Sequence, residues 1–239
     1  PFQLLQSESG EKARVLAEAR GVAADASLVL EPWYISSAAT TSSAEPPHDT
    51  LAAGTRLLRI YDPTRHRASA TSFRHFGPTE RFDHHRPTAG AADNDPDRAI
   101  LYTGRTLSCC IAEVFGDRGA IETGAREVAE LMVTRPLILL DLRRNGAMRA
   151  GTVAAIGKIA DRPVSQEWSR YFYEHPAHYM VVEGLMWYGA HNDEECVALY
   201  ERARNAITCP PGATVRLDDP ALRPELLTIA HGLNLVPPA

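Results

Sequence analysis

Short runs of apolar residues, each about the length of one β-strand, most constrain how this chain folds. They lie at residues 55–61, 99–103, 128–133, 137–142, 179–187 and 196–200. Segments with a helical spacing of apolar residues lie between and after these runs, at residues 106–115, 151–159, 166–175 and 221–231. The two kinds of segment do not alternate in a regular strand–helix–strand order, so the sequence predicts an α+β fold of short strands packed with helices.

The first 50 residues differ from the rest of the 239-residue chain. Residues 10–20 have the pattern of a short amphipathic helix that ends before Gly21. Residues 36–50 are dominated by Ser, Ala, Thr and Pro, a composition that cannot bury a core. We therefore predict an N-terminal helix and low-complexity linker over residues 1–50, followed by one compact domain over residues 51–239.

Charge and cysteine content exclude several classes of protein. The chain carries 25 Lys and Arg against 30 Asp and Glu, a net charge of −5, so we predict no direct contact with nucleic acid. Glu183 interrupts the most apolar stretch, well short of the ~20 residues that span a bilayer, so we predict no membrane partner. Four cysteines without a Cys-x-x-Cys pair and the absence of a secretory signal favour the cytoplasm. Because the numbering begins at a proline, removal of an earlier segment stays open.

Several ligand-binding motifs fail on their spacing. Gly151 and Gly157 resemble a phosphate-binding loop, but five residues separate them instead of four, so we predict an ordinary helix there. Residues 74–98 are polar and rich in Pro, Gly, Asp and His, which predicts a long surface loop with His84 and His85 in solvent. Neither calcium nor zinc spacing is complete, and we predict no metal site.

A group of chemically capable residues remains between positions 59 and 113. In chain order it consists of Arg59, the Arg81-Phe82 pair, Tyr102 and Glu113. Each alone has an ordinary structural explanation, such as a solvated arginine or a helix glutamate facing water. Glu113 stands out because its predicted helix has two unlike sides. One side is a stripe of core residues, namely Leu107, Cys110, Ile111, Val114 and Phe115. On the other side Glu113 is surrounded by small residues that let a ligand approach, namely Cys109, Ala112 and Gly116.

Taken together, Arg59, Arg81-Phe82, Tyr102 and residues 112–115 resemble the RES domain, and the likeness extends over about residues 51–217. The resemblance implies a core similar in fold to ADP-ribosyltransferases. It also implies a toxin of a toxin–antitoxin pair that degrades NAD⁺ by phosphorolysis or hydrolysis. The partner implied is an Xre-type helix-turn-helix antitoxin that covers the active site. NAD⁺ would be the substrate and inorganic phosphate the co-substrate, with no cofactor required.

These residue types suit cleavage of the bond between nicotinamide and ribose. The transition state carries positive charge at the anomeric carbon, which a buried Glu113 carboxylate would stabilise while it binds ribose hydroxyls. Arg59 or Arg81 would bind pyrophosphate oxygens in a bidentate manner. Tyr102 would stack on the nicotinamide ring. We thus predict Arg59, Tyr102 and Glu113 as catalytic, and Arg81 and Phe82 as substrate-binding.

The family serine, which the resemblance places at the end of the 184–190 strand, falls on Gly189 in our register. We retain Gly189 as a substrate-binding position. Its lack of a hydroxyl leaves open a different register, a role for Ser165 or Ser169, and a catalytically silent binding module. A mono-ADP-ribosyltransferase acting on a protein is the alternative enzyme. The acceptor (phosphate, water or protein) and the formation of a homodimer also stay open.

Overall fold

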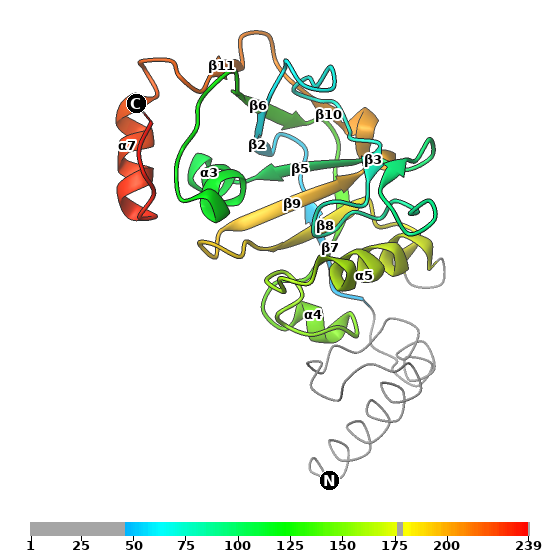
Figure 1. The fold of residues 1–239 in the computed structure, drawn as a ribbon. Coiled ribbons are helices and arrows are strands. Elements are labelled where there is room, and N and C mark those ends of the chain that lie inside the picture. Colours follow the sequence, from blue (N-terminus) through cyan, green and yellow to red (C-terminus); the bar gives the residue numbers. More distant parts are fainter. Residues whose placement is uncertain (1–45, 176–178, 239) are drawn as a thin grey trace.

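The computed structural model describes residues 46–175 and 179–238 (Figure 1). The predicted helix at residues 10–20 and the predicted linker as far as residue 45 lie outside the described residues. In the part of the chain that the structure describes, no helix combines the length and apolar character needed to cross a membrane.

A mixed β-sheet forms the centre of the described structure. Its order is β1-β7-β8-β9-β5-β2-β6-β10, with β11 also paired to β6. Strands β7 and β8 are parallel, and the other neighbours in the sheet are antiparallel. The strands are β1 (His48–Leu51), β2 (Arg56–Tyr61), β5 (Ile100–Gly104), β6 (Glu127–Val133), β7 (Leu137–Asp141), β8 (Gly184–Tyr188), β9 (Glu195–Tyr200), β10 (Ile207–Thr208) and β11 (Thr214–Arg216).

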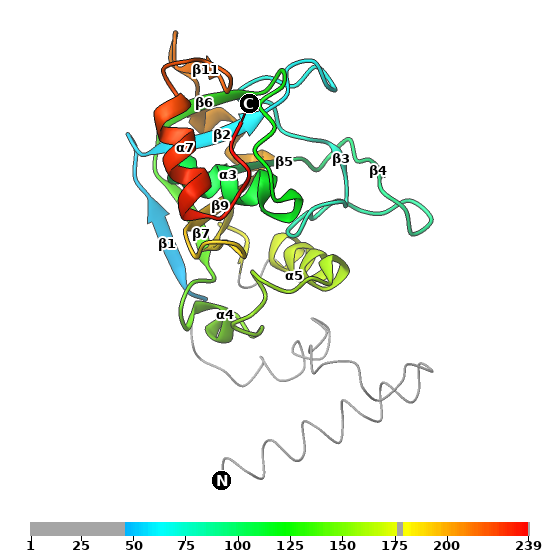
Figure 2. The same ribbon diagram turned by 60° about the vertical axis from the view of Figure 1, so that its left-hand side comes forward.

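Helices pack on this sheet at separate places. Figures 1 and 2 show α3 and α7 side by side, with α5 farther along the sheet beside β7 and β8. The helical elements are α3 (Leu107–Phe115), η2 (Gly116–Arg118), α4 (Gly146–Arg149), α5 (Arg162–Glu174), η3 (Glu201–Ala206) and α7 (Arg223–Gly232). Together with the sheet they confirm the predicted α+β class.

The core divides according to strand alternation. Ile100 of β5 packs in a cluster with Trp168 and Phe172 of α5, whereas its neighbour Leu101 belongs to a second cluster. Successive strand residues point to opposite faces, so these two clusters cover the two sides of the sheet. A third cluster joins α3 to α7 through Phe115 and Leu226. The short apolar runs therefore became strands because each of them contributes to one or both faces of this core.

Within the described residues, the predicted strands and three of the four predicted helices are found, most of them close to their expected bounds. The predicted strand at 179–187 starts only at β8, because Val182 N donates to Tyr179 O in a turn that precedes it. The helix predicted at 151–159 is wrong, since this segment forms successive turns. Gly151 has a φ of 87°, which interrupts the helix. Gly157 lets the Trp187 side chain pack closely, with Cδ1 2.8 Å from where a Cβ would stand.

Residues 74–98 form the predicted surface loop only in part, since residues 86–94 are mostly exposed while residues 82–85 are buried. The segment includes the two-residue strands β3 (Phe76–Gly77) and β4 (Asp93–Asn94), and His84 and His85 are fully buried. One polar partner for each ring makes this burial tolerable. His84 Nε2 lies 3.0 Å from Glu201 Oε2, and His85 Nε2 donates to Arg74 O over 3.0 Å. The prediction of solvent-facing histidines is therefore wrong.

The edge strand β1 includes residues that we had placed at the end of the linker. His48, Asp49 and Thr50 pair with β7, and Leu51 pairs with Leu137. The sheet of the compact domain thus begins at His48.

Candidate functional site

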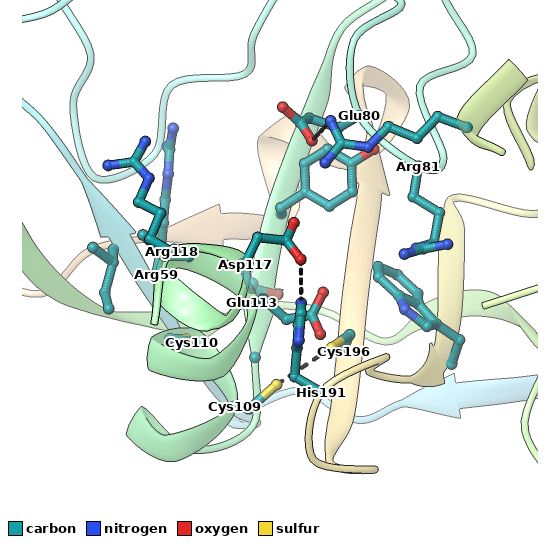
Figure 3. A pocket seen from close by; sticks show the side chains of 17 residues that line it. Arg59, Glu80, Arg81, Cys109, Cys110, Glu113, Asp117, Arg118, His191 and Cys196 are labelled. Atoms are coloured by element: carbon teal, nitrogen blue, oxygen red, sulfur yellow. Dashed lines mark hydrogen bonds and ion pairs between the residues drawn. The ribbon is translucent and has the colours of Figure 1, made fainter. Parts of the chain in front are cut away.

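A pocket of about 510 Å³ opens on the helix-bearing face of the sheet, between α3, the start of α5 and the ends of β5, β8 and β9. Arg59, Arg81, Tyr102 and Glu113 all line it (Figure 3). The structure therefore brings together four of the six predicted site residues, although they come from β2, the loop before β5, β5 and α3. Phe82 and Gly189 are not among its lining residues.

Helix α3 forms one wall of the pocket. Thr106 caps its start, since its side-chain oxygen accepts a hydrogen bond from Cys109 N over 2.9 Å. Our assignment of its two sides needs correction. Cys109 and Ala112 are 1% exposed, while Val114 is 36% exposed and lines the pocket. The buried sector is wider than predicted because α3 packs against β2 and β5 beneath it and α7 beside it.

Glu113 is exposed and not buried as predicted, because the pocket that it lines is open to solvent. It nevertheless does not point freely into solvent. Its Oε1 accepts a hydrogen bond from Ala190 N over 3.1 Å. The carboxylate is thus held against the turn that follows β8, where a single backbone amide fixes it.

Gly189 supplies the space for this contact. A Cβ at position 189 would stand 2.6 Å from Glu113 Oε1 and 3.1 Å from Cys196 Sγ. Gly189 N donates to Glu194 O over 2.8 Å, so the turn is also fixed on its other side. Its contribution to the site is therefore close approach of the carboxylate.

Arg59 projects from β2 and is half-buried. Its Nη1 donates to three carbonyl oxygens, those of Ser69, Ala70 and Ser72, over 2.9, 3.0 and 2.7 Å. Burial lowers the pKa of Arg59 to about 10. These bonds use one nitrogen of a guanidinium that carries five N–H donors, so donors remain for an anion in the pocket.

Three further arginines line the pocket: Arg81, Arg118 and Arg162. Burial lowers the pKa of Arg81, whereas the nearby Glu113 carboxylate acts in the opposite direction. Arg81 Nη1 also donates to Ile159 O. Arg162 is ion-paired with Glu80 over 3.0 Å, which links α5 to the loop that carries Arg81.

The hydroxyl of Tyr102 is hydrogen-bonded within the protein. The hydroxyl donates to Asp83 Oδ1 over 2.8 Å and accepts from Phe82 N over 3.1 Å. Burial, followed by the Asp83 charge, raises the pKa of Tyr102 well above its ordinary value. The ring is therefore the part of Tyr102 that remains for contact with a ligand. Phe82 itself lies in the core, edge-on to Trp187 at 4.8 Å between ring centroids.

Sequence reasoning missed other pocket residues. Trp187 lines the pocket and stands at 88° to the Tyr102 ring, yet its apolar strand suggested only a core role. His191 also lines it, with Nε2 3.6 Å from Asp117 Oδ1. The His191 ring packs on Gly116, where a Cβ would stand 2.6 Å from Nδ1. No motif or spacing marks these residues.

The two serines considered as substitutes for the family serine do not line the pocket. Ser165 Oγ donates to Arg162 O over 2.9 Å within α5. Ser169 Oγ donates to Phe82 O over 2.6 Å. Both side chains are fully buried and hydrogen-bonded to backbone.

Comparison with known proteins gives two positive findings. The family model described as the RES domain matches residues 56–219. The fold is similar to a chain in the crystal structure of the M. tuberculosis MbcT–MbcA toxin–antitoxin complex, with a TM-score of 0.51 and 17% sequence identity. That similarity covers 75% of this chain and 92% of the other. No curated protein matches the sequence.

Proposed function

Because this chain belongs to the RES domain family, we propose that it is the toxin of a toxin–antitoxin pair and cleaves the nicotinamide–ribose bond of NAD⁺. The observation that carries the proposal is that Arg59, Arg81, Tyr102 and Glu113 all line one pocket. A volume of about 510 Å³ lies within the range of pockets that hold small molecules and cofactors.

The pocket contains arginines that can bind the anionic pyrophosphate of the dinucleotide. Guanidinium groups bind phosphate oxygens through paired hydrogen bonds, and arginines lie on both sides of the pocket. Desolvation of Arg59 strengthens its interaction with an anion, because the effective dielectric constant is lower there than in water. These features support binding of the pyrophosphate by Arg59 and Arg81.

Glu113 suits the bond that breaks. The bond between ribose C1′ and the nicotinamide nitrogen cleaves with its electron pair passing to nitrogen, while an acceptor oxygen bonds to C1′. Positive charge develops on the ribose, and a nearby carboxylate stabilises it. Nicotinamide leaves as a neutral base, so no general acid is needed. The exposed Glu113 carboxylate is accessible to such a substrate and is oriented by Ala190 N.

Tyr102 and Trp187 supply the aromatic surface. Their rings are perpendicular, with centroids 6.3 Å apart, and both line the pocket. An aromatic ring stacked on nicotinamide would hold it in the pose in which C1′ faces Glu113. Since the Tyr102 hydroxyl is occupied, we assign this contact to the ring face.

An antitoxin that covers the pocket is the partner that we propose. The similar solved structure is of a toxin–antitoxin complex, which supports a protein partner of this class. A helix-turn-helix antitoxin of the Xre type and a cytoplasmic location follow from the family as further parts of the proposal.

The direct test is incubation of the purified chain with NAD⁺, with and without inorganic phosphate, followed by chromatography of nicotinamide and the ribosyl product. Phosphorolysis requires phosphate for turnover, whereas hydrolysis gives ADP-ribose in its absence. With NAD⁺ labelled in its ADP-ribose part, label that precipitates with acid would indicate transfer of ADP-ribose to protein. Absence of nicotinamide release under all conditions contradicts the proposed function. Glu225→Gln is the control for substitutions at Glu113, because Glu225 is an exposed helix glutamate outside the pocket.

A further inference from the structure

We propose that Asp83 is a positioning residue of this site, which fixes both the Tyr102 ring and the turn that carries Arg81. This inference rests on the proposed function, since it concerns residues of the same pocket. Asp83 itself does not line the pocket and is fully buried behind it. Its effect on the reaction would therefore pass through its neighbours.

The Asp83 carboxylate is surrounded by donors from two elements. Oδ1 accepts from the Tyr102 hydroxyl over 2.8 Å and from Arg74 Nη2 over 2.7 Å. Oδ2 accepts from Thr79 N over 2.6 Å and Glu80 N over 2.9 Å. A buried carboxylate is tolerated when its oxygens are satisfied in this way. The arrangement leaves little freedom for a different set of partners.

The first consequence concerns the orientation of Tyr102. Its hydroxyl donates to Asp83 and accepts from Phe82 N, so both hydrogen-bonding directions of the phenol are used. The two hydrogen bonds hold the hydroxyl end of the ring in place, and the ring stands perpendicular to Trp187. Since the ring is the part that faces the pocket, Asp83 determines the surface on which a planar ligand group stacks.

The second consequence concerns Arg81. Asp83 N donates to Glu80 O over 3.2 Å, which closes a turn with Arg81 inside it. The carboxylate of the same residue binds the amides of Thr79 and Glu80 at the start of that turn. Glu80 and Arg81 both line the pocket. One buried side chain therefore joins the wall that carries Tyr102 to the wall that carries Arg81.

The charge of Asp83 is balanced locally. Burial alone would raise the pKa of Asp83, but the Arg74 guanidinium and the amides of the turn hold it below the ordinary value. The carboxylate consequently stays ionised and remains an acceptor for the phenol at neutral pH.

Asp95 provides a matched control within the same loop. It is also buried, with 3% exposure, and its carboxylate binds an arginine, Arg86, over 2.5 Å. It accepts as well from Arg86 N and Asp97 N. Among the described residues, the hydrogen-bond partners of Asp95 do not include Tyr102, and Asp95 does not line the pocket. Loss of a buried carboxylate from the loop can thus be separated from loss of the bond to Tyr102.

The test is a double-mutant cycle on NAD⁺ cleavage with the full chain: wild type, Asp83→Asn, Tyr102→Phe and the double variant, with Asp95→Asn as control. We expect kcat/KM to fall about 10- to 100-fold in each single variant, as for a misplaced binding group. The double variant should be no worse than Asp83→Asn, because Asp83→Asn already disturbs the hydrogen bond that Tyr102→Phe removes. Asp95→Asn should stay within about threefold of wild type.

Several outcomes overturn the inference: unchanged kcat/KM in Asp83→Asn, multiplicative losses in the double variant, or equal losses in Asp95→Asn. Should Asp83→Asn fail to fold, Tyr102→Phe decides, since it keeps the ring and removes only the hydroxyl. Wild-type activity in Tyr102→Phe then contradicts the proposal.

Hydrogen exchange separates failure of this inference from failure of the proposed function. The amides of Thr79 and Glu80 should exchange faster in Asp83→Asn than in wild type, whether or not the protein cleaves NAD⁺. An inactive wild type refutes the proposed function. Unaltered exchange at the turn refutes the positioning role of Asp83 independently of activity.

Discussion

The two walls of the pocket hold their carboxylates in opposite ways. The helix wall, which we define as α3 with the turn after β8, presents Glu113 in an exposed position with one hydrogen bond, from Ala190 N. The loop wall, residues 79–83, contains Asp83 with no exposed surface and with bonds from Arg74, Thr79, Glu80 and Tyr102. Both acids lie close to the same pocket, but only one of them can exchange its partner for a substrate.

This difference indicates a division of roles. A carboxylate whose oxygens are all bound within the protein is costly to disturb and serves to hold other groups. A carboxylate with a single backbone partner keeps lone pairs for ribose hydroxyls or a developing charge. We therefore assign chemistry to the helix wall and geometry to the loop wall. Substitution of Glu113 in the helix wall should therefore lower activity more than stability, and substitution of Asp83 in the loop wall should lower stability.

The largest effect that we expect is on activity, in Glu113→Gln. Gln keeps the size and the acceptor oxygen of the side chain but cannot stabilise positive charge on the ribose. We predict that kcat for NAD⁺ cleavage falls about 1000-fold, while KM stays within about threefold. Steady-state assays of nicotinamide release measure both constants.

The stability of Glu113→Gln should resemble that of wild type, because an exposed side chain with one hydrogen bond contributes little to folding. Urea unfolding provides this comparison, and Glu225→Gln controls for loss of one surface charge. A large drop in stability with full activity would reverse the roles assigned to the walls.

Asp83→Ala should give the largest effect on stability. It leaves two backbone amides and the partly exposed Arg74 guanidinium without this acceptor. Removal of one partner of a buried ion pair typically costs about 3 kcal/mol. Urea unfolding at pH 7 should show a loss of that order, against less than about 0.5 kcal/mol for Glu113→Ala. Similar losses in both variants would remove the distinction between the walls.

Much of the fold was predictable because the deciding interactions are local or repetitive. The apolar runs reveal β5, β6, β7 and β9, since each strand needs residues for a buried face. Thr106 and Gly116 mark the two ends of α3 in the sequence. The RES likeness likewise depended on residue types in order along the chain, and the family match confirms it.

The burial of the loop wall and of the histidines that follow it was not predictable, since it depends on contacts with other segments and not on a local pattern. His84 becomes a core residue only through Glu201, 117 positions later, and Asp83 only through Arg74 and Tyr102. Composition alone makes such a segment polar and therefore solvated. The helix predicted over residues 151–159 failed for a related reason, because Trp187 packs on Gly157 from another strand.

Acid should destabilise the protein first through His84 and His85, the buried histidines that follow the loop wall. Burial lowers the pKa of His84 to about 4, against about 6.5 in the unfolded chain. As pH falls from 6.5 to 5, the unfolded state binds a proton that folded His84 does not take up, so stability decreases. We expect about 1.5 kcal/mol from His84 over this range. Burial lowers the pKa of His85 as well, which adds a loss of the same sign.

Urea unfolding at several pH values measures this slope. His84→Gln should flatten it, since Gln does not titrate, while His231→Gln on exposed α7 should leave it unchanged. An unchanged slope in His84→Gln would mean that other groups dominate the acid response.

Gly189→Ala tests the helix wall by the addition of a single methyl group. The added Cβ would stand 2.6 Å from Glu113 Oε1, so the flexible end of the glutamate must move away from Ala190 N. Folding should be little affected, whereas nicotinamide release should fall about tenfold because the carboxylate loses its orientation. Gly232→Ala is the control, since a Cβ there meets nothing within 4 Å. Full activity in Gly189→Ala would show that the Ala190 contact does not orient Glu113 for the reaction. The walls would then differ only in how many protein groups bind their carboxylates: one backbone amide for Glu113 and several donors for Asp83.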